Sequence, residues 1–234
     1  MTLKLYAHPL SSYCHKALIA FYENDTPFEF LMVGDPTKTD PKVWEEFKTM
    51  WPIGKFPVLK DTARDDWFVP EATIIIEYLA QHYPGKVKLI PDDADLARRV
   101  RMMDRFFDNY LHAPMQKINF DKIRPADKRD PAGVEDAKTM YRTALDMLER
   151  AIEGKRWAMG DAFTMADCAA GPPLFYGNMQ IPFEKTHPNA HAYLKRLKSR
   201  PSSARALKEA EPFFNLLPKL KSAAGKLFFP AARN

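Results

Sequence analysis

A strand, a sharp turn and the start of a helix follow one another within the first 20 residues, and this feature constrains the fold most strongly. Leu3, Leu5 and Ala7 alternate with a lysine and a tyrosine, which is typical of a short strand with one buried face. A His-Pro pair then ends the strand, because proline has no backbone N–H to donate and fixes its own φ. The chain must therefore leave the sheet at this point.

Two serines stand where the helix begins. Ser11 and Ser12 are of the residue type that caps a helix N-terminus by accepting hydrogen bonds from its free N–H groups. The residues that follow place an apolar stripe at i, i+4, i+7 and i+8, which predicts a helix: Cys14, Leu18, Phe21 and Tyr22. A helix N-terminus carries partial positive charge, so the pattern predicts a site for an anion, whether phosphate, carboxylate or thiolate.

The composition is that of a globular protein. The chain has 234 residues, enough for one large domain or two smaller ones with proper cores. Apolar residues make up 46% and charged residues 28%. No apolar run approaches the roughly 20 residues of a membrane-spanning helix, and no leader pattern precedes the first strand. We therefore expect a cytoplasmic protein that acts without a membrane.

The cysteines and histidines predict no metal site. Cys14 and Cys168 are too few for a disulfide framework or a four-cysteine zinc site, and we expect both to be buried and inert. His187 and His191 have the i, i+4 spacing of metal ligands, but no third ligand accompanies them.

The net charge of +5 is unevenly distributed, because acidic residues prevail over residues 1–84 and basic residues over 185–234. A basic C-terminal segment could attract nucleic acid. The alternative is a solvated helix face, and basic residues interleaved with apolar ones around 193–198 favour it. We expect no nucleic-acid partner, because no recognised nucleic-acid module accompanies the charge.

Prolines and a glycine between residues 84 and 91 mark the clearest division of the chain. Strand and helix patterns alternate before this segment, and helical patterns alone follow it. We expect an α/β domain over residues 1–84, a linker over 85–93 and an all-α domain over 94–234.

Four motifs, in this order and at this spacing, resemble the cytosolic glutathione transferase family. They are Ser-Ser-Tyr-Cys-His-Lys at 11–16, Gly-Lys-Phe-Pro-Val-Leu at 54–59, Glu-Ala-Thr-Ile-Ile-Ile-Glu-Tyr-Leu at 71–79 and Thr-Met-Ala-Asp at 164–167. The resemblance covers nearly the whole chain and is to serine-type, bacterial-like members. It implies a thioredoxin-like N-terminal domain of βαβ-ββα order with a cis peptide bond before Pro57, an all-helical C-terminal domain, and a homodimer.

The resemblance also implies a chemistry and a set of site residues. The thiol of glutathione, the co-substrate, has a pKa of about 8.5, so little thiolate exists at pH 7. Ser11 matches the position whose hydroxyl donates to the thiolate, and the thiolate would attack a small hydrophobic electrophile. The implied glutathione-binding residues are Ser11, Lys55, Phe56, Pro57, Glu71 and Ala72. The implied electrophile pocket faces Ser11 from the helical domain and consists of Met103, Phe106, Phe107 and Tyr110. We expect His15 and Lys16, beside this site in the sequence, on the surface.

One departure from the family pattern bears on function. Ala72 stands where the family usually has a serine, so one hydrogen bond to a carboxylate of glutathione is missing, which predicts weaker affinity. Another glutathione-dependent enzyme, such as an isomerase, dehalogenase, peroxidase or ether-cleaving lyase, stays an alternative, and so does a non-catalytic homologue that binds glutathione or another ligand.

Overall fold

The computed structural model describes residues 2–35 and 37–217. Its first part is a four-stranded sheet in the order β2-β1-β3-β4. β1 pairs with β2 in parallel and with β3 in antiparallel orientation, so that Leu5 lies between Phe30 and Leu59. β4 completes the sheet antiparallel to β3. The elements of this part are β1 (Leu3–Ala7), α1 (Ser12–Glu23), β2 (Glu29–Met32), α2 (Pro41–Met50), β3 (Val58–Asp61), β4 (Trp67–Pro70) and α3 (Ala72–His82).

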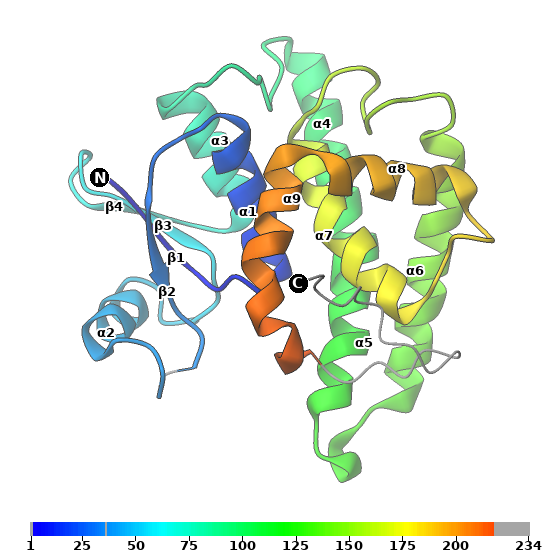
Figure 1. The fold of residues 1–234 in the computed structure, drawn as a ribbon, viewed down its shortest axis with the longest axis horizontal. Coiled ribbons are helices and arrows are strands. Elements are labelled where there is room, and N and C mark those ends of the chain that lie inside the picture. The colour runs from blue at the N-terminus through cyan, green and yellow to red at the C-terminus, as the bar shows by residue number, and fades with distance from the viewer. Residues whose placement is uncertain (1, 36, 218–234) are drawn as a thin grey trace, which may run out of the picture.

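In the described remainder of the chain every named element is helical, which is the order that the sequence predicted, so the predicted fold class is confirmed (Figure 1). α3 ends at His82 and α4 begins at Ala94. The exact domain limits stay a prediction. The elements of this part are α4 (Ala94–Phe106), η1 (Phe107–His112), α5 (Ala113–Ile123), η2 (Ala126–Lys128), α6 (Pro131–Ala151), α7 (Met165–Gln180), α8 (Pro188–Ser199), α9 (Pro201–Ala210) and η3 (Glu211–Leu216).

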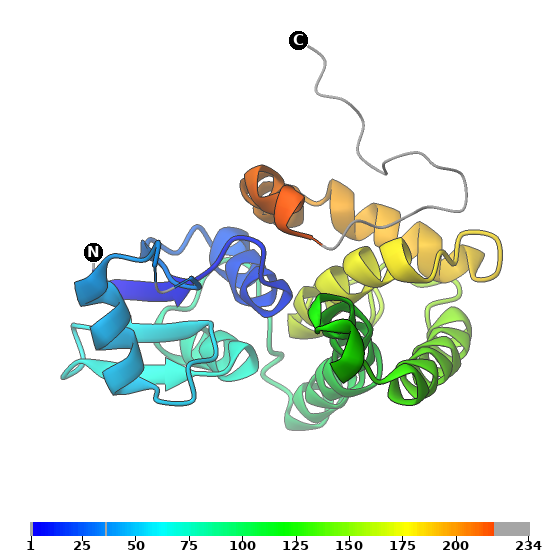
Figure 2. The same cartoon turned by 90° about the horizontal axis from the view of Figure 1, so that it is seen from below.

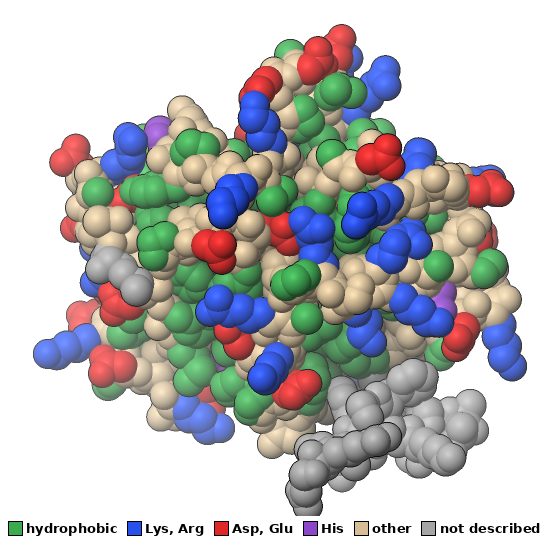
Figure 3. Space-filling model, turned by 45° about the horizontal axis from the view of Figure 1, so that its top comes forward, with side chains coloured by type: hydrophobic (Ala, Val, Ile, Leu, Met, Phe, Trp, Pro, Cys, Tyr) green, Lys and Arg blue, Asp and Glu red, His purple; other side chains and the backbone are tan. Residues whose placement is uncertain are grey.

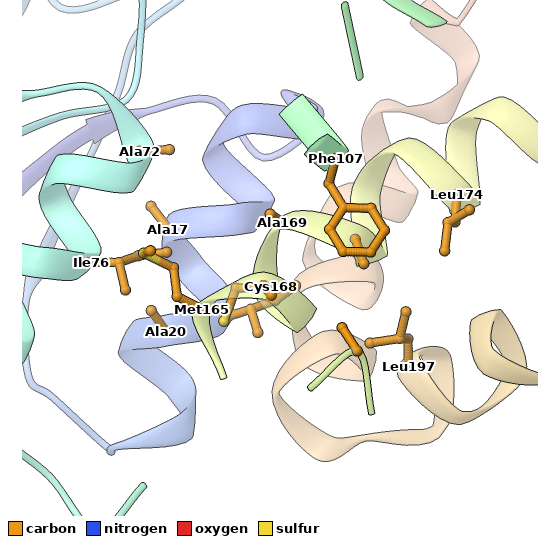
Figure 4. Packing of buried hydrophobic residues seen from close by; sticks show 14 of the residues in the cluster. Ala17, Ala20, Ala72, Ile76, Phe107, Met165, Cys168, Ala169, Leu174 and Leu197 are labelled. Atoms are coloured by element: carbon orange, nitrogen blue, oxygen red, sulfur yellow. The ribbon is translucent and has the colours of Figure 1, made fainter. Parts of the chain in front are cut away.

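Helix α1 lies at the junction of the two parts, with the sheet and α3 on one side and α7 and α9 on the other (Figure 2). It is buried on almost every face for this reason. Figure 4 shows the small side chains Ala17 and Ala20 of α1 in one apolar cluster with Ile76 of α3 and Cys168 of α7. One continuous core therefore fixes α1 against both parts of the molecule.

Helices α4 and α5 form one column that is interrupted by the π-helical turn η1. Pro114 accounts for the interruption, because it has no N–H for the carbonyl four residues earlier and its ring would clash with that carbonyl. The N–H of Ala113 donates instead to the carbonyl of Asp108, five residues back. Because the π-helical turn is wider, the side chains of α5 do not continue the faces that the side chains of α4 form.

The start of α7 is fixed by the capping box that the sequence predicted. Asp167 is completely buried and accepts a hydrogen bond from the backbone N–H of Thr164 at 2.8 Å. Its other oxygen accepts from the Ala158 N–H at 2.8 Å and from the Tyr193 hydroxyl at 2.6 Å. This single carboxylate thus joins the loop before α7, α7 itself and α8.

Charged side chains of both signs are interspersed over the face of the molecule shown in Figure 3. In the part of the chain that the structure describes, no helix is both long enough and apolar enough to cross a membrane.

Candidate functional site

The turn between β1 and α1 presents Ser11 at the helix N-terminus. The Ser11 Oγ accepts a hydrogen bond from the Cys14 N–H at 3.4 Å, so Ser11 caps the helix. This bond uses a lone pair of the oxygen and leaves the hydroxyl hydrogen unused by the cap. His8 Nδ1 accepts from the Leu10 N–H at 3.1 Å, and the Tyr176 hydroxyl donates to the Leu10 carbonyl at 3.2 Å. The turn that carries Ser11 is therefore held from inside and from α7.

A second irregular segment approaches the same place. The Phe56-Pro57 peptide bond is cis, which confirms what the family resemblance implied. Phe56 is half-buried, and its ring centroid lies 6.4 Å from that of His8 in the first turn. The segment before β3 thus reaches the turn after β1.

Glu71 adopts an unusual backbone conformation immediately before α3. Its φ of 71° lies in the region that favours glycine, and such a residue typically costs about 1–3 kcal/mol. Its side chain is exposed and makes no capping hydrogen bond to α3. The first N–H groups of α3, beginning at Ala72, have no partner within the helix. A carboxylate side chain and a helix N-terminus therefore stand side by side.

A cavity of about 270 Å³ brings Ser11, Ser12 and Phe56 together. Of the predicted glutathione-binding residues, Ser11 and Phe56 line this cavity, whereas Lys55, Pro57, Glu71 and Ala72 do not. Most of the wall comes from the helical part of the chain, with mainly apolar side chains. These are Met115, Gln116, Asn119, Phe120 and Ile123 of α5, Tyr176 of α7, and Leu216 and Leu217 at the end of the described chain.

The four residues expected in the electrophile pocket are not among the residues that line this cavity. Phe107 is fully buried in the core, near Ala169 and Leu174 of α7 (Figure 4). Phe106 is buried, Met103 is half-buried and Tyr110 is exposed. Met103 and Phe106 lie on α4, and Phe107 and Tyr110 lie on the π-helical turn η1. The side chains of this column that line the cavity lie further along the chain, on α5.

Lys16 is completely buried, so the expectation of a surface position was wrong. Its Nζ lies 2.7 Å from a carboxylate oxygen of Asp104 and 2.7 Å from one of Asp108. It also donates to the Thr73 hydroxyl at 2.7 Å. Arg105 contacts both carboxylates from the solvent side. We call Lys16, Thr73, Asp104, Arg105 and Asp108 the ionic cluster; it joins α1 and α3 to α4 and η1.

His15 is also buried, again contrary to expectation, and its Nε2 lies 2.5 Å from the Pro9 carbonyl. Burial lowers the pKa of His15 to about 4, although the contact with that carbonyl raises it. The imidazole is therefore neutral at physiological pH and contributes to the turn that carries Ser11.

His112 connects the cavity to the ionic cluster. Its Nε2 lies 2.6 Å from the Ser12 Oγ, and its Nδ1 lies 3.8 Å from an oxygen of Asp108. The ring stacks on Tyr13, with centroids 3.7 Å apart and planes inclined by 14°. Burial lowers the pKa of His112, and the neighbouring Asp108 carboxylate opposes this effect. Burial alone would raise the pKa of Asp108, but His112 and Lys16 outweigh it and lower that pKa to about 2.

Cys14 lies beneath the turn rather than in the cavity. Its side chain is completely buried, and its Sγ accepts a hydrogen bond from the His8 N–H at 3.5 Å. Burial raises the pKa of the thiol to about 12, so it stays protonated at physiological pH. The prediction of a buried Cys14 is confirmed.

Taken together, the cavity combines a hydroxyl and a helix N-terminus at one side with an apolar wall at the other. A hydroxyl hydrogen beside the positive end of a helix stabilises an anion. The wall would bury an apolar partner of that anion. Within residues 2–35 and 37–217, no three metal-ligating side chains lie close enough to hold a metal ion.

Comparison with known proteins gives two family matches. Residues 5–87 match the model of the glutathione S-transferase N-terminal domain, and residues 111–201 match that of the C-terminal domain. The glutathione S-transferase-like protein LUC7 of Fusarium sp is 30% identical over 136 residues, which are 58% of this chain and 61% of LUC7.

Two longer matches extend over most of the chain. The glutathione S-transferase hmp2 of Hypomyces subiculosus is 26% identical over 90% of this chain and 100% of its own length. A solved glutathione S-transferase of Methylobacterium radiotolerans, in complex with glutathione sulfonate, superposes with a TM-score of 0.74 at 25% identity. That superposition covers 87% of this chain and 93% of the other.

Proposed function

Because this chain belongs to the glutathione S-transferase family, we propose that it conjugates the thiolate of glutathione to small hydrophobic electrophiles. The observation that carries the proposal is the cavity in which Ser11, at the N-terminus of α1, faces a largely apolar wall. The Methylobacterium relative, crystallised with glutathione sulfonate, supports glutathione as the first substrate.

Each part of glutathione has a counterpart in the proposal. The Ser11 hydroxyl donates to the thiolate, which the dipole of α1 also stabilises. The backbone of Phe56, held by the cis bond to Pro57, pairs with the cysteinyl residue of glutathione. The exposed Glu71 binds the ammonium of the γ-glutamyl group, while the backbone N–H of Ala72 receives its carboxylate. Lys55 lies near the glycyl end.

In this proposal the electrophile binds in the cavity, against the wall that α5 contributes. Met115, Phe120 and Ile123 supply apolar surface, and Gln116 and Asn119 add two amides. A wall of this kind favours a compact apolar acceptor with at most a few polar groups. A detoxifying role in the cytoplasm is part of the proposal.

We further propose that the protein is a homodimer. Trp67 of β4, Ile74 of α3 and Met102 of α4 are exposed although they are large and apolar. Trp67 and Ile74 line one groove with Arg101. Sedimentation at physiological salt should give twice the 26.9 kDa of one chain. A species of one chain alone would contradict the dimer.

The test of the reaction is a panel of electrophiles with glutathione, applied to the wild type and to Ser11→Ala. Loss of the charge-assisted hydrogen bond should raise the pKa of bound glutathione by about one unit, or 1.4 kcal/mol. Conjugation near pH 7 should then fall about tenfold and recover partly at higher pH. Ser199→Ala, on α8 outside the cavity, is the matched control. If no electrophile reacts with the wild type, a binding role replaces the proposed enzyme.

A further inference from the structure

Ser12 and Ser11 line the same cavity, but their hydroxyl groups have different hydrogen-bond partners. The Ser11 Oγ accepts a hydrogen bond from the backbone of its own helix. The Ser12 Oγ lies 2.6 Å from Nε2 of His112, which is completely buried. A serine in a cavity wall whose hydroxyl lies within hydrogen-bond distance of a buried imidazole is placed for proton transfer.

The surroundings of His112 indicate which ring nitrogen carries the proton. Nδ1 lies 3.8 Å from an oxygen of the Asp108 carboxylate, too far for a hydrogen bond, but the negative charge favours a proton on Nδ1 over a lone pair there. Nε2 of the neutral ring is then unprotonated and accepts the hydrogen of the Ser12 hydroxyl. The oxygen of Ser12 then has only lone pairs left for a ligand in the cavity that Ser12 lines. Ser12 can thus accept a proton there, whereas Ser11 keeps a hydrogen that it can donate.

We propose that Ser12 and His112 form a relay that removes the thiol proton of bound glutathione. This proposal rests on the proposed function of the cavity. In the step, the S–H bond of glutathione breaks and a new O–H bond forms on Ser12. The former hydroxyl hydrogen of Ser12 moves to Nε2 of His112. The products are a thiolate, which Ser11 stabilises, and an imidazolium, with Ser12 again a neutral hydroxyl.

The charges near His112 fit this step. In the ionic cluster, the cations Lys16 and Arg105 are balanced by the carboxylates Asp104 and Asp108. The cluster thus has no net charge of its own, and the thiolate compensates the charge of the imidazolium. The parallel stack with Tyr13 fixes the plane of the ring.

Titratable groups face His112 from each neighbouring element. Asp108 lies on its own turn, and Tyr13, His15 and Lys16 lie on α1. Asp104 and Arg105 of α4 act on it through their contacts with Lys16 and Asp108. Tyr176 of α7 packs against His15. Burial keeps the imidazole neutral while the site is empty, which is the state that can accept a proton.

The relay makes a prediction that a structural role does not make. If His112 keeps the proton, glutathione binding at pH 7 forms thiolate but releases less than one proton to the buffer per thiolate. Ultraviolet absorbance measures the thiolate, and calorimetry in two buffers of different ionisation heat measures the protons released. His112→Gln keeps an acceptor for the Ser12 hydroxyl at a similar position but cannot bind the proton.

For His112→Gln we expect one proton released per thiolate, and less thiolate at pH 7. Conjugation near pH 7 should fall by about a hundredfold, the lower end of what a positioned proton acceptor contributes, and recover at high pH. Ser12→Ala interrupts the relay at its other end, so it should also release one proton per thiolate and lower conjugation near pH 7. His187→Gln is the matched control, because His187 also contacts a carboxylate, at 2.9 Å from Asp146, but lies on the helical part outside the cavity.

The possible outcomes separate the relay from the proposed function. If the wild type binds no glutathione, the proposed function fails and the relay fails with it. The deciding quantity is the ratio of protons released to thiolate formed. If this ratio is one in the wild type, or if His112→Gln and Ser12→Ala both keep the wild-type ratio, the relay is refuted while the proposed function stands. A ratio below one that rises to one in both variants, with His187→Gln unchanged, supports the relay.

Discussion

Replacing Lys16 by methionine should destabilise the fold strongly, although the lysine lies outside the cavity lining. Lys16→Met keeps most of the apolar stem and removes the ammonium. The ammonium contacts Asp104, Asp108 and Thr73, each at 2.7 Å, and no part of the side chain is exposed. Removing one partner of a buried ion pair typically costs about 3–5 kcal/mol, because a charge is left uncompensated. Arg105 still contacts both carboxylates, so we expect about 3 kcal/mol, the lower end of this range.

The loss of stability in Lys16→Met should depend on pH in a defined direction. The pKa of Asp108 is about 2 in the folded protein, below the value of about 3.9 for an unfolded chain. Its charge therefore contributes stability that is present above about pH 4 and is lost as the pH falls towards 2. Without Lys16 the pKa of Asp108 should rise towards its unfolded value. Protonation of Asp108 at low pH then costs the variant less stability than it costs the wild type. The difference between wild type and Lys16→Met should accordingly shrink below about pH 4.

Urea unfolding followed by circular dichroism measures both effects. Lys38→Met is the matched control, because Lys38 is exposed and lies 3.5 Å from Asp35 across a surface pair. Such a pair should contribute at most about 0.5 kcal/mol. In the double variant with Asp104→Asn, the loss should be smaller than the sum of the single losses. A loss for Lys16→Met no larger than that for Lys38→Met would refute the reasoning.

Two further predictions concern Cys14, beneath the turn that carries Ser11, and Ala72, at the start of α3. Cys14→Ala should lower the free energy of unfolding by about 1 kcal/mol, because it leaves a small cavity, and should leave kcat unchanged; complete loss of activity in a folded variant would mean that the thiol reacts. Ala72→Ser should tighten glutathione binding about tenfold or more in calorimetry, since a hydrogen bond to a charged group contributes about 1.5–3 kcal/mol; equal affinities would show that the backbone alone holds the carboxylate.

The features that the sequence predicted well are local. The alternation in residues 3–7 and the capping box at Thr164 each depend on neighbours within a few positions. Such patterns follow from backbone sterics and hydrogen bonding alone. Ser11 and Phe56 line one cavity although they are far apart in the sequence, and only the family resemblance brought these two segments together.

The features that the sequence did not reveal depend on tertiary packing. A lysine on a helix is usually solvated, and only the position of α1 between the two parts of the molecule makes Lys16 a buried residue. One signal did exist, because Asp104 and Asp108 stand at i, i+4 beside the buried Val100 and Phe107. Two carboxylates on an apolar face require a cation. The irregular turn before α5 had a signal too, in Pro114, which a regular helix running through this region would not tolerate.

Six consecutive residues of the chain, 11–16, contact three different environments, and this arrangement has a mechanical consequence. Ser11 and Ser12 line the cavity, Cys14 is buried beneath the turn, and Lys16 lies in the ionic cluster. The last two are fixed before any ligand arrives, one by the core and the other by carboxylates of α4 and η1. The first turn of α1 therefore has little freedom to adjust. A thiolate that binds there meets a hydroxyl and a helix N-terminus already in position, so little binding energy has to be used for ordering them.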